Sequence, residues 1–482
     1  MNRLIIYPIL RLLDWLRRYP LSPIFRWLEA HPGARQWLGV FRLGLFQFGV
    51  GLSLAPVTGT LNRVLIDDLR ISAAVVGLLI SLHYFVSPVR AVIGYRSDKA
   101  RSMGRWRTPY LVLGVILTYA GLALAPFSLI LLGGFGVIPF WLALIICLVI
   151  FAAYGAGVSI VETIYLALVS DITPPKSRGK VLAFLWAMLI LGTIVSAVIV
   201  SGLLVEYSHA LLIRVMQGSA MVFVFLTVVA LWNQEGLNRD GTVKSDLKTV
   251  RIRLSLWESL RLLGEKKLLR GFFAIIFMAT MAFATHDVLL EPYGGQVLGM
   301  SVSATMRLTA LWGVATIFGV SLAAFLLWRK QTPVLLMGLG CGVGLVGFAV
   351  ISLASDAALV NPFRVGVALI STGRGLFLVG SVILVMSLTD VSHAGFLLGV
   401  WGIVQAMGQG FGTIGGGVVR DLVQFQTGSV VLGYTAVYVT SLVLLLLVIL
   451  ILIFRLGSRL NVSEIKLPWS GLEEIPADQL AF

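Results

Sequence analysis

Long, continuous apolar stretches alternate with short polar connections along most of the chain. Each stretch is about 20 residues long, which as a helix is enough to cross the roughly 30 Å hydrocarbon core of a bilayer. Because lipid offers the backbone no hydrogen-bond partners, and because the stretches do not alternate with period two, they predict helices. We expect twelve membrane-spanning helices, at residues 39–66, 72–94, 109–131, 138–168, 180–205, 212–232, 270–293, 303–328, 333–355, 363–388, 395–418 and 430–455.

The composition agrees with a membrane protein. Of the 482 residues, 58% are hydrophobic and 12% are charged, and that much apolar surface cannot be buried inside a water-soluble globule. The formal net charge of +15 is also typical of nucleic-acid binding. However, the lysines and arginines lie between apolar stretches and form no separate basic domain, so we assign them to a membrane face in contact with lipid headgroups and expect no nucleic-acid partner.

The cations also predict how the chain is oriented. They are concentrated after the second, fourth and eighth expected helices, whereas intervening connections such as 133–138 and 355–361 have almost none. Because lysine and arginine favour cytoplasmic loops, both termini are expected in the cytoplasm, with the protein in an inner membrane. Residues 1–38 carry arginines between apolar residues at helical spacing. This fits a basic amphipathic helix on the membrane surface, and an irregular basic tail is the alternative.

The expected helices divide into two related halves. Residues 39–232 form a first six-helix half, 233–269 a polar cytoplasmic linker, 270–455 a second half and 456–482 a cytoplasmic tail. The pattern Thr-Pro-x-Leu-x-x-Gly occurs at 108–114 and again at 332–338, at the start of the third helix of each half. Such parallel repeats are typical of carriers built around a central cavity.

Two loops resemble the cytoplasmic signatures of the major facilitator superfamily, whose fold has two six-helix halves. One follows the second helix and the other joins the fourth and fifth helices. Their matching residues are Gly94, Asp98, Lys99, Gly104 and Arg105 in the first loop and Asp171, Pro174, Arg178 and Gly179 in the second. A glycine lets two helices approach closely, and an aspartate can face a helix N-terminus or an arginine. The insertion between Lys99 and Gly104 is longer than the family pattern has.

A third set of motifs is similar to the bacteriochlorophyll delivery (PucC/LhaA) family of that superfamily. It comprises Leu45-Phe-Gln47, Leu61-Asn-Arg-Val-Leu-Ile-Asp67, Asp287-Val-Leu-Leu-Glu-Pro-Tyr-Gly-Gly295 and Gly395-Phe-Leu-Leu-Gly-Val-Trp-Gly402. The resemblance covers about Arg42 to Arg420. It implies a protein of a photosynthetic membrane that assembles light-harvesting antennas, with antenna apoproteins or other photosynthetic membrane proteins as partners and transient (bacterio)chlorophyll as cargo.

Charged residues within the helices indicate a gate and a cavity. Asp287 and Glu291 are four residues apart, on one face of a helix, and by the expected topology Arg63 lies at the same exoplasmic level. We expect Arg63 to pair with one carboxylate and close the exoplasmic side, and solvated interfacial charges are the alternative. Glu162 and Arg374, with Tyr293, are expected to border the central cavity, where a charge could bind a polar group or couple to protons. A structural tie between the halves is the alternative.

Pigment delivery also requires an axial ligand to magnesium, and neutral imidazole is suited to that role. Two of the histidines, His83 and His286, lie inside expected helices, and a packed core histidine is the alternative for each. On the eleventh helix, Gly408, Gly412 and Gly416 recur every fourth residue, which permits close helix contact. They predict either internal packing or a docking groove for the helix of a partner.

The sequence contains no nucleotide cradle, nucleophile elbow or metal-ligand spacing, so we expect neither an enzyme nor a metal site. Three functions remain. The first is an antenna assembly factor that delivers pigment within the membrane, and the second is a proton-coupled exporter of a small hydrophobic compound. The third is a scaffold without a ligand. The fifth helix lacks the proline-containing glycine motif of drug antiporters, which counts against the exporter.

Overall fold

The computed structural model describes residues 32–86, 108–134, 138–172, 178–231, 267–354, 359–387 and 394–456, and the regular elements in these ranges are all helices. Most of the N-terminal segment, the linker and the tail lie outside the described residues. So do the first signature loop, from Gly94 to Arg105, and Pro174. Asp171 lies in the last turn of one helix and Arg178 begins the next, but their side chains are outside the description as well.

Within the described residues, the first half contains six helical segments. The first of these is α3, which continues through two π-helical stretches, η1 and η2, and the third is interrupted by the short 3-10 turn η3. The bounds are α3 Pro32–Ala55, η1 Pro56–Leu61, η2 Val64–Asp68, α4 Ala73–Phe85, α6 Thr108–Leu124, η3 Ala125–Phe127, α7 Ser128–Leu132, α8 Phe140–Ile172, α9 Arg178–Leu203 and α10 His209–Leu231.

The second half repeats this arrangement, except that its first segment is divided into α12 and α13. The bounds are α12 Lys267–Ala284, α13 Leu290–Gln296, α14 Val302–Trp328, α15 Pro333–Ala354, α16 Val360–Ser387, α17 Ala394–Thr427, α18 Val430–Ile451 and η5 Leu452–Leu456. Most boundaries lie within a few residues of the expected ones. The repeated Thr-Pro motif does begin equivalent helices, α6 and α15, although Gly114 packs against α8 while Gly338 meets open space.

Nine helical segments in the described ranges are long and apolar enough to cross a membrane. The other three are the short α4, the divided α12 and α13, and the more polar α17. Large apolar side chains such as Phe225, Leu353 and Phe425 are exposed on the outer surface, as expected where lipid is the solvent. The chain is therefore a multi-pass helical membrane protein, and the total of twelve spans stays a prediction.

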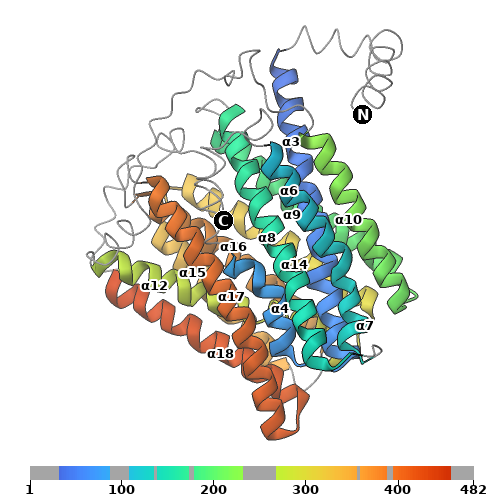
Figure 1. Ribbon diagram of the computed structural model, residues 1–482. Helices are drawn as coiled ribbons and strands as arrows, with labels where there is room; N and C mark the ends of the chain where they lie inside the picture. The colour runs from blue at the N-terminus through green and yellow to red at the C-terminus, as the bar shows by residue number, and fades with distance from the viewer. Residues whose placement is uncertain are drawn as a thin grey trace, which may run out of the picture.

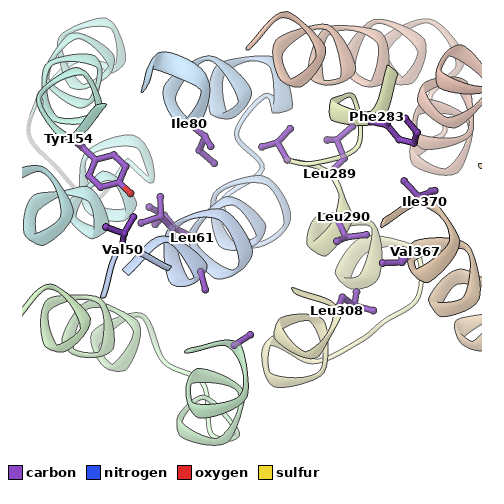
Figure 2. Close-up of a cluster of buried hydrophobic side chains, with 14 of the residues drawn as sticks. Val50, Leu61, Ile80, Tyr154, Phe283, Leu289, Leu290, Leu308, Val367 and Ile370 are labelled. Carbon is purple, nitrogen blue, oxygen red and sulfur yellow. The ribbon is translucent and has the colours of Figure 1, made fainter. Parts of the chain in front are cut away.

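The two halves lie side by side, with α3, α6, α8 and α10 on one side of the molecule and α12, α15, α17 and α18 on the other (Figure 1). They contact each other where α4 packs on α17 and α9 packs on α14. The buried core extends into both halves, from Val50 and Leu61 to Phe283 and Val367 (Figure 2). We call the end that carries connections 69–72, 204–208, 297–301 and 428–429 the distal end.

A proline in the first helix explains its irregular path. Pro56 has no N–H, so the carbonyl of Leu52, four residues earlier, has no helical donor. Ser196 on α9 supplies a donor instead, because its hydroxyl donates to the Leu52 carbonyl at 2.7 Å. Neighbouring helices commonly satisfy backbone groups released by proline within a membrane. The helix therefore continues through η1 and η2 instead of ending at the proline.

Candidate functional site: a polar cluster at the broken seventh helix

The seventh helix is interrupted where its acidic residues occur. α12 ends at Ala284, residues 285–289 form turns, and α13 begins at Leu290. Pro292 again has no N–H for the carbonyl four residues before it, which belongs to Val288. Asn62, from the first helix, donates to that carbonyl at 3.0 Å. The prediction of a continuous helix over 270–293 is therefore wrong. The carbonyl released at the break accepts its hydrogen bond from the other half of the protein.

Asn62 also links the halves through Glu291, which is almost fully buried. The side-chain amide nitrogen of Asn62 lies 3.4 Å from one carboxylate oxygen of Glu291, and the hydroxyl of Thr309 on α14 donates to the other oxygen at 2.7 Å. Neither partner is a cation. The carboxyl group is thus held by two neutral donors from the first and eighth helices.

Arg63 does not pair with Asp287 or Glu291, so the expected latch is wrong. Its Nη2 lies 3.2 Å from Asp67, one helical turn further along, and donates to the carbonyl of Met300 at 3.0 Å. The irregular first helix places the guanidinium beside Asp67, while the break in the seventh helix separates the two predicted carboxylates. Arg63 still joins the halves, but through a backbone carbonyl.

Asp287 instead pairs with Arg374 on α16. Both carboxylate oxygens accept from Nη1 of Arg374 at 2.9 Å, and the guanidinium lies 5.7 Å from the ring centre of Trp312 on α14. The pair lies within the second half, so Arg374 is not the tie between halves considered from the sequence. Tyr84 on α4 is within electrostatic range of both partners and of Glu162. We call Tyr84, Glu162, Asp287, Trp312 and Arg374 the central cluster.

Of the residues expected in a cavity, Glu162 and Arg374 are each within electrostatic range of Tyr84, whereas Tyr293 lies in the core of the second half. Tyr293 is 1% exposed and packs against Phe363, Tyr434 and Tyr438 inside the second half. Tyr293 belongs to α13, which begins anew at Leu290 after the turns, so its rotation differs from that of a continuous helix. Glu162 lines a pocket of the first half together with Phe46, Val50, Ser53, Thr118, Val158, Val161 and Phe223.

At the distal end the halves are joined by Asp421, which the sequence analysis did not single out. Its Oδ2 accepts hydrogen bonds from the hydroxyl of Ser72 at 2.6 Å and from the backbone N–H of Ala74 at 2.9 Å. A carboxylate at these first N–H groups of α4 acts as an N-cap supplied by another helix. Arg420 donates to its other oxygen at 2.8 Å. An Arg-Asp pair at the end of an apolar stretch gives no sequence signal for this role.

Two further contacts close the same end. Arg420 donates to the side chain of Gln296 at 2.6 Å, and Gln296 donates to the carbonyl of Ile66 at 3.0 Å. Ser201 on α9 and Ser303 on α14 donate to each other's backbone carbonyl, at 2.9 and 2.7 Å. The distal contacts are therefore polar, range from exposed at Ser72 to buried at Ser201, and are distributed over several helices.

Replacing Asp421 with alanine is expected to loosen the distal end, because α4 then loses its cap at a cost of about 1 kcal/mol. The measurement is maleimide labelling of Ser201→Cys in a chain whose buried Cys147 and Cys341 are replaced by alanine. Labelling should be about fivefold faster, the factor equivalent to that energy. Asp68→Ala, which removes an exposed distal carboxylate, is the control. Equal rates in both variants would contradict the capping role.

The two histidines differ in their fit to a pigment ligand. His286 is fully buried, neither ring nitrogen has a hydrogen-bond partner among the described residues, and its ring packs edge-on against Phe348, with the ring centres 5.3 Å apart. Neither nitrogen is accessible to the magnesium of a pigment, so that prediction is wrong. Nδ1 of half-buried His83 lies 2.7 Å from the carbonyl of Ile80. A carbonyl can only accept, so Nδ1 carries the proton and the neutral ring has its lone pair on Nε2, as in metal-ligating histidines.

The glycines of the eleventh helix serve internal packing. A side chain at Gly408 or Gly412 would meet α12, at the carbonyls of Phe277 and Met281, and one at Gly416 would meet the carbonyl of Thr285 in the turn that follows α12. The docking alternative therefore does not hold for these three residues. Gly417, on another face, abuts the Ala73 carbonyl of α4, whereas Gly415 has no neighbour within 4 Å. α17 thus lies between a helix of its own half and a helix of the other half.

Solved structures with the same fold are membrane carriers. A bacterial homologue of the human lysosomal transporter Spinster, in an inward-facing and unoccupied conformation, aligns with a TM-score of 0.67 and 14% identity, over 92% of this chain and 98% of its own. The nucleoside transporter NupG aligns with a TM-score of 0.63 and 14% identity, over 86% and 98%. At these identities the likeness concerns the fold, which is that of the major facilitator superfamily.

Sequence comparison gives the family. Residues 60–459 match the family described as PUCC protein, and the chain belongs to this family. "Protein PucC" of Cereibacter sphaeroides is 37% identical over 80% of this chain and 84% of its own. An "uncharacterized protein in puhA-bchM intergenic region" of Rhodobacter capsulatus is 36% identical over 95% and 99%. A further relative from that species, 29% identical over 80% and 88%, is named "Bacteriochlorophyll synthase 44.5 kDa chain".

Proposed function

We propose that this protein assembles photosynthetic light-harvesting complexes, binding antenna apoproteins and delivering (bacterio)chlorophyll to them within the membrane. Membership of the PUCC family is the observation that carries the proposal. The name of one relative refers to bacteriochlorophyll, and the solved proteins of this fold are carriers. In this role the protein is not an enzyme. It lies in the inner (cytoplasmic or photosynthetic) membrane with both termini in the cytoplasm.

The geometry supports a cargo site between the halves. Ionisable groups inside a membrane are costly, and they usually face a cavity or a partner. The central cluster brings such groups together from α4, α8 and α16 and from the break in the seventh helix. Discontinuous helices at the junction of two repeats are a common place for substrate binding in carriers. His83, one residue before Tyr84, is the candidate magnesium ligand because of its tautomer.

The test is purification in mild detergent from a phototrophic host, followed by absorption spectroscopy and identification of bound proteins. We expect a chlorin absorption band and co-purified antenna subunits, and a His83→Leu variant that keeps the subunits but loses most of the band. Antenna subunits without pigment would contradict delivery and leave a scaffold. Pigment that remains bound at the wild-type level in His83→Leu would remove His83 from the site.

A proton-coupled exporter of a small hydrophobic compound is the second candidate. It is favoured by the buried Glu291, which has neutral partners only among the described residues. Purified protein that contains neither pigment nor antenna subunits, together with substrate-dependent proton movement in vesicles, would support the exporter over the assembly factor.

A further inference from the structure

The guanidinium of Arg374 has one occupied side and one open edge. Nη1 donates to both oxygens of Asp287 at 2.9 Å, whereas no described residue accepts a hydrogen bond from Nε or Nη2. The side chain keeps 14% of its surface exposed, and neither nitrogen is among the fully buried, unpartnered atoms of the described residues. Nε–H and Nη2–H of arginine point in parallel, at the spacing of the two oxygens of a carboxylate. The open edge is thus the one that binds a carboxylate bidentately.

Two neighbours hold this edge in a fixed orientation. Asp287 lies at Nη1, and the face of Trp312 lies 5.7 Å from the central carbon of the guanidinium. A cation over an indole ring is attracted to it, so the stack and the ion pair restrain the same group. A ligand that binds the open edge therefore loses little further side-chain entropy on the protein side.

The ion pair lies near the first half of the protein. Tyr84 on α4, a helix of that half, is within electrostatic range of both Arg374 and Asp287. A ligand on Arg374 would thus contact both halves, at the position where carriers of this architecture bind substrates. That the rest of such a ligand is apolar rests on the proposed function.

We propose that the open edge of Arg374 binds the carboxylate of an amphipathic cargo, so that the protein selects the free acid over its ester. The identity of the apolar body, a chlorin, rests on the proposed function. The cargo would then be a tetrapyrrole with an unesterified propionic acid, positioned with its acid group at Arg374 and its ring between the halves.

The test uses two probes that differ in one methyl group, pyropheophorbide a and its methyl ester. Both lack magnesium, so a histidine ligand does not contribute. Binding to the purified protein is followed by chlorin fluorescence anisotropy, with empty micelles as the blank. We expect the free acid to bind at least about tenfold more tightly, the usual effect of charge-assisted hydrogen bonds.

The matched variant is Asp287→Asn/Arg374→Gln, which removes both charges and leaves no unpaired ion. It should bind both probes with the affinity that the wild type has for the ester. Arg374→Lys, which keeps the charge but lacks the parallel N–H groups, should retain part of the preference. Equal binding of acid and ester to the wild type would overturn the carboxylate site and leave pigment binding intact. Failure of both probes to bind would overturn the site and also count against pigment delivery.

Discussion

Replacing Asp287 with alanine is expected to destabilise the protein by about 3 kcal/mol, because Arg374 would remain in the membrane interior without its counter-ion. Breaking a buried ion pair from one side commonly costs about 3 to 5 kcal/mol. We take the lower value because the two side chains keep 14% and 24% of their surface exposed. The loss should appear as a lower midpoint of thermal unfolding in detergent and a smaller folded fraction after solubilisation.

The neutral double variant Asp287→Asn/Arg374→Gln is the control for this prediction. It keeps similar shapes and leaves no isolated charge, so its unfolding midpoint should lie much closer to that of the wild type. A double variant as unstable as Asp287→Ala would show that the packing of these two side chains, and not the balance of their charges, stabilises the broken seventh helix.

The helices could be predicted from the sequence because each depends on a local property, the length of an apolar stretch. α14 and α15, expected at 303–328 and 333–355, are found at Val302–Trp328 and Pro333–Ala354. The break in the seventh helix was missed although Pro292 was visible. A proline within an apolar stretch is compatible with a kink or with a break, and the result depends on which group serves the released carbonyl. Here that group is Asn62, more than two hundred residues away.

The partners of the charged residues could not be predicted for a related reason. The sequence places Arg63, Asp287 and Glu291 at one level of the membrane, and proximity along the membrane normal then suggests that they pair. Pairing also depends on rotation about each helix axis. The turns at 285–289 change that rotation between Asp287 and Glu291, and the π-helical stretches change it beside Arg63. Charges deep in a membrane tend to face the bundle interior, and the structure places Arg374 beside Asp287 in the second half and Glu162 at a pocket of the first half.

Two adjacent glycines of α17 give the second large predicted effect, because replacing each by alanine should change the stability of the protein in opposite directions. A Cβ at Gly416 would overlap the carbonyl oxygen of Thr285, at the end of α12, whereas a Cβ at Gly415 would meet nothing within 4 Å. We expect Gly416→Ala to destabilise the protein by about 3 kcal/mol, the upper end of the usual overpacking cost, because the obstacle is backbone. Gly415→Ala should stabilise it by up to about 1 kcal/mol, the difference in helix propensity.

The comparison is made by thermal unfolding of both variants in the same detergent. Because both substitutions are glycine to alanine in neighbouring positions of one helix, their effects on the unfolded chain cancel. The difference between them therefore measures the contact of α17 with α12. This contact supports the turn segment that holds Asp287, so Gly416→Ala should also weaken the preference for the free-acid chlorin. Equal stabilities of the two variants would mean that α17 does not pack on α12 at this face.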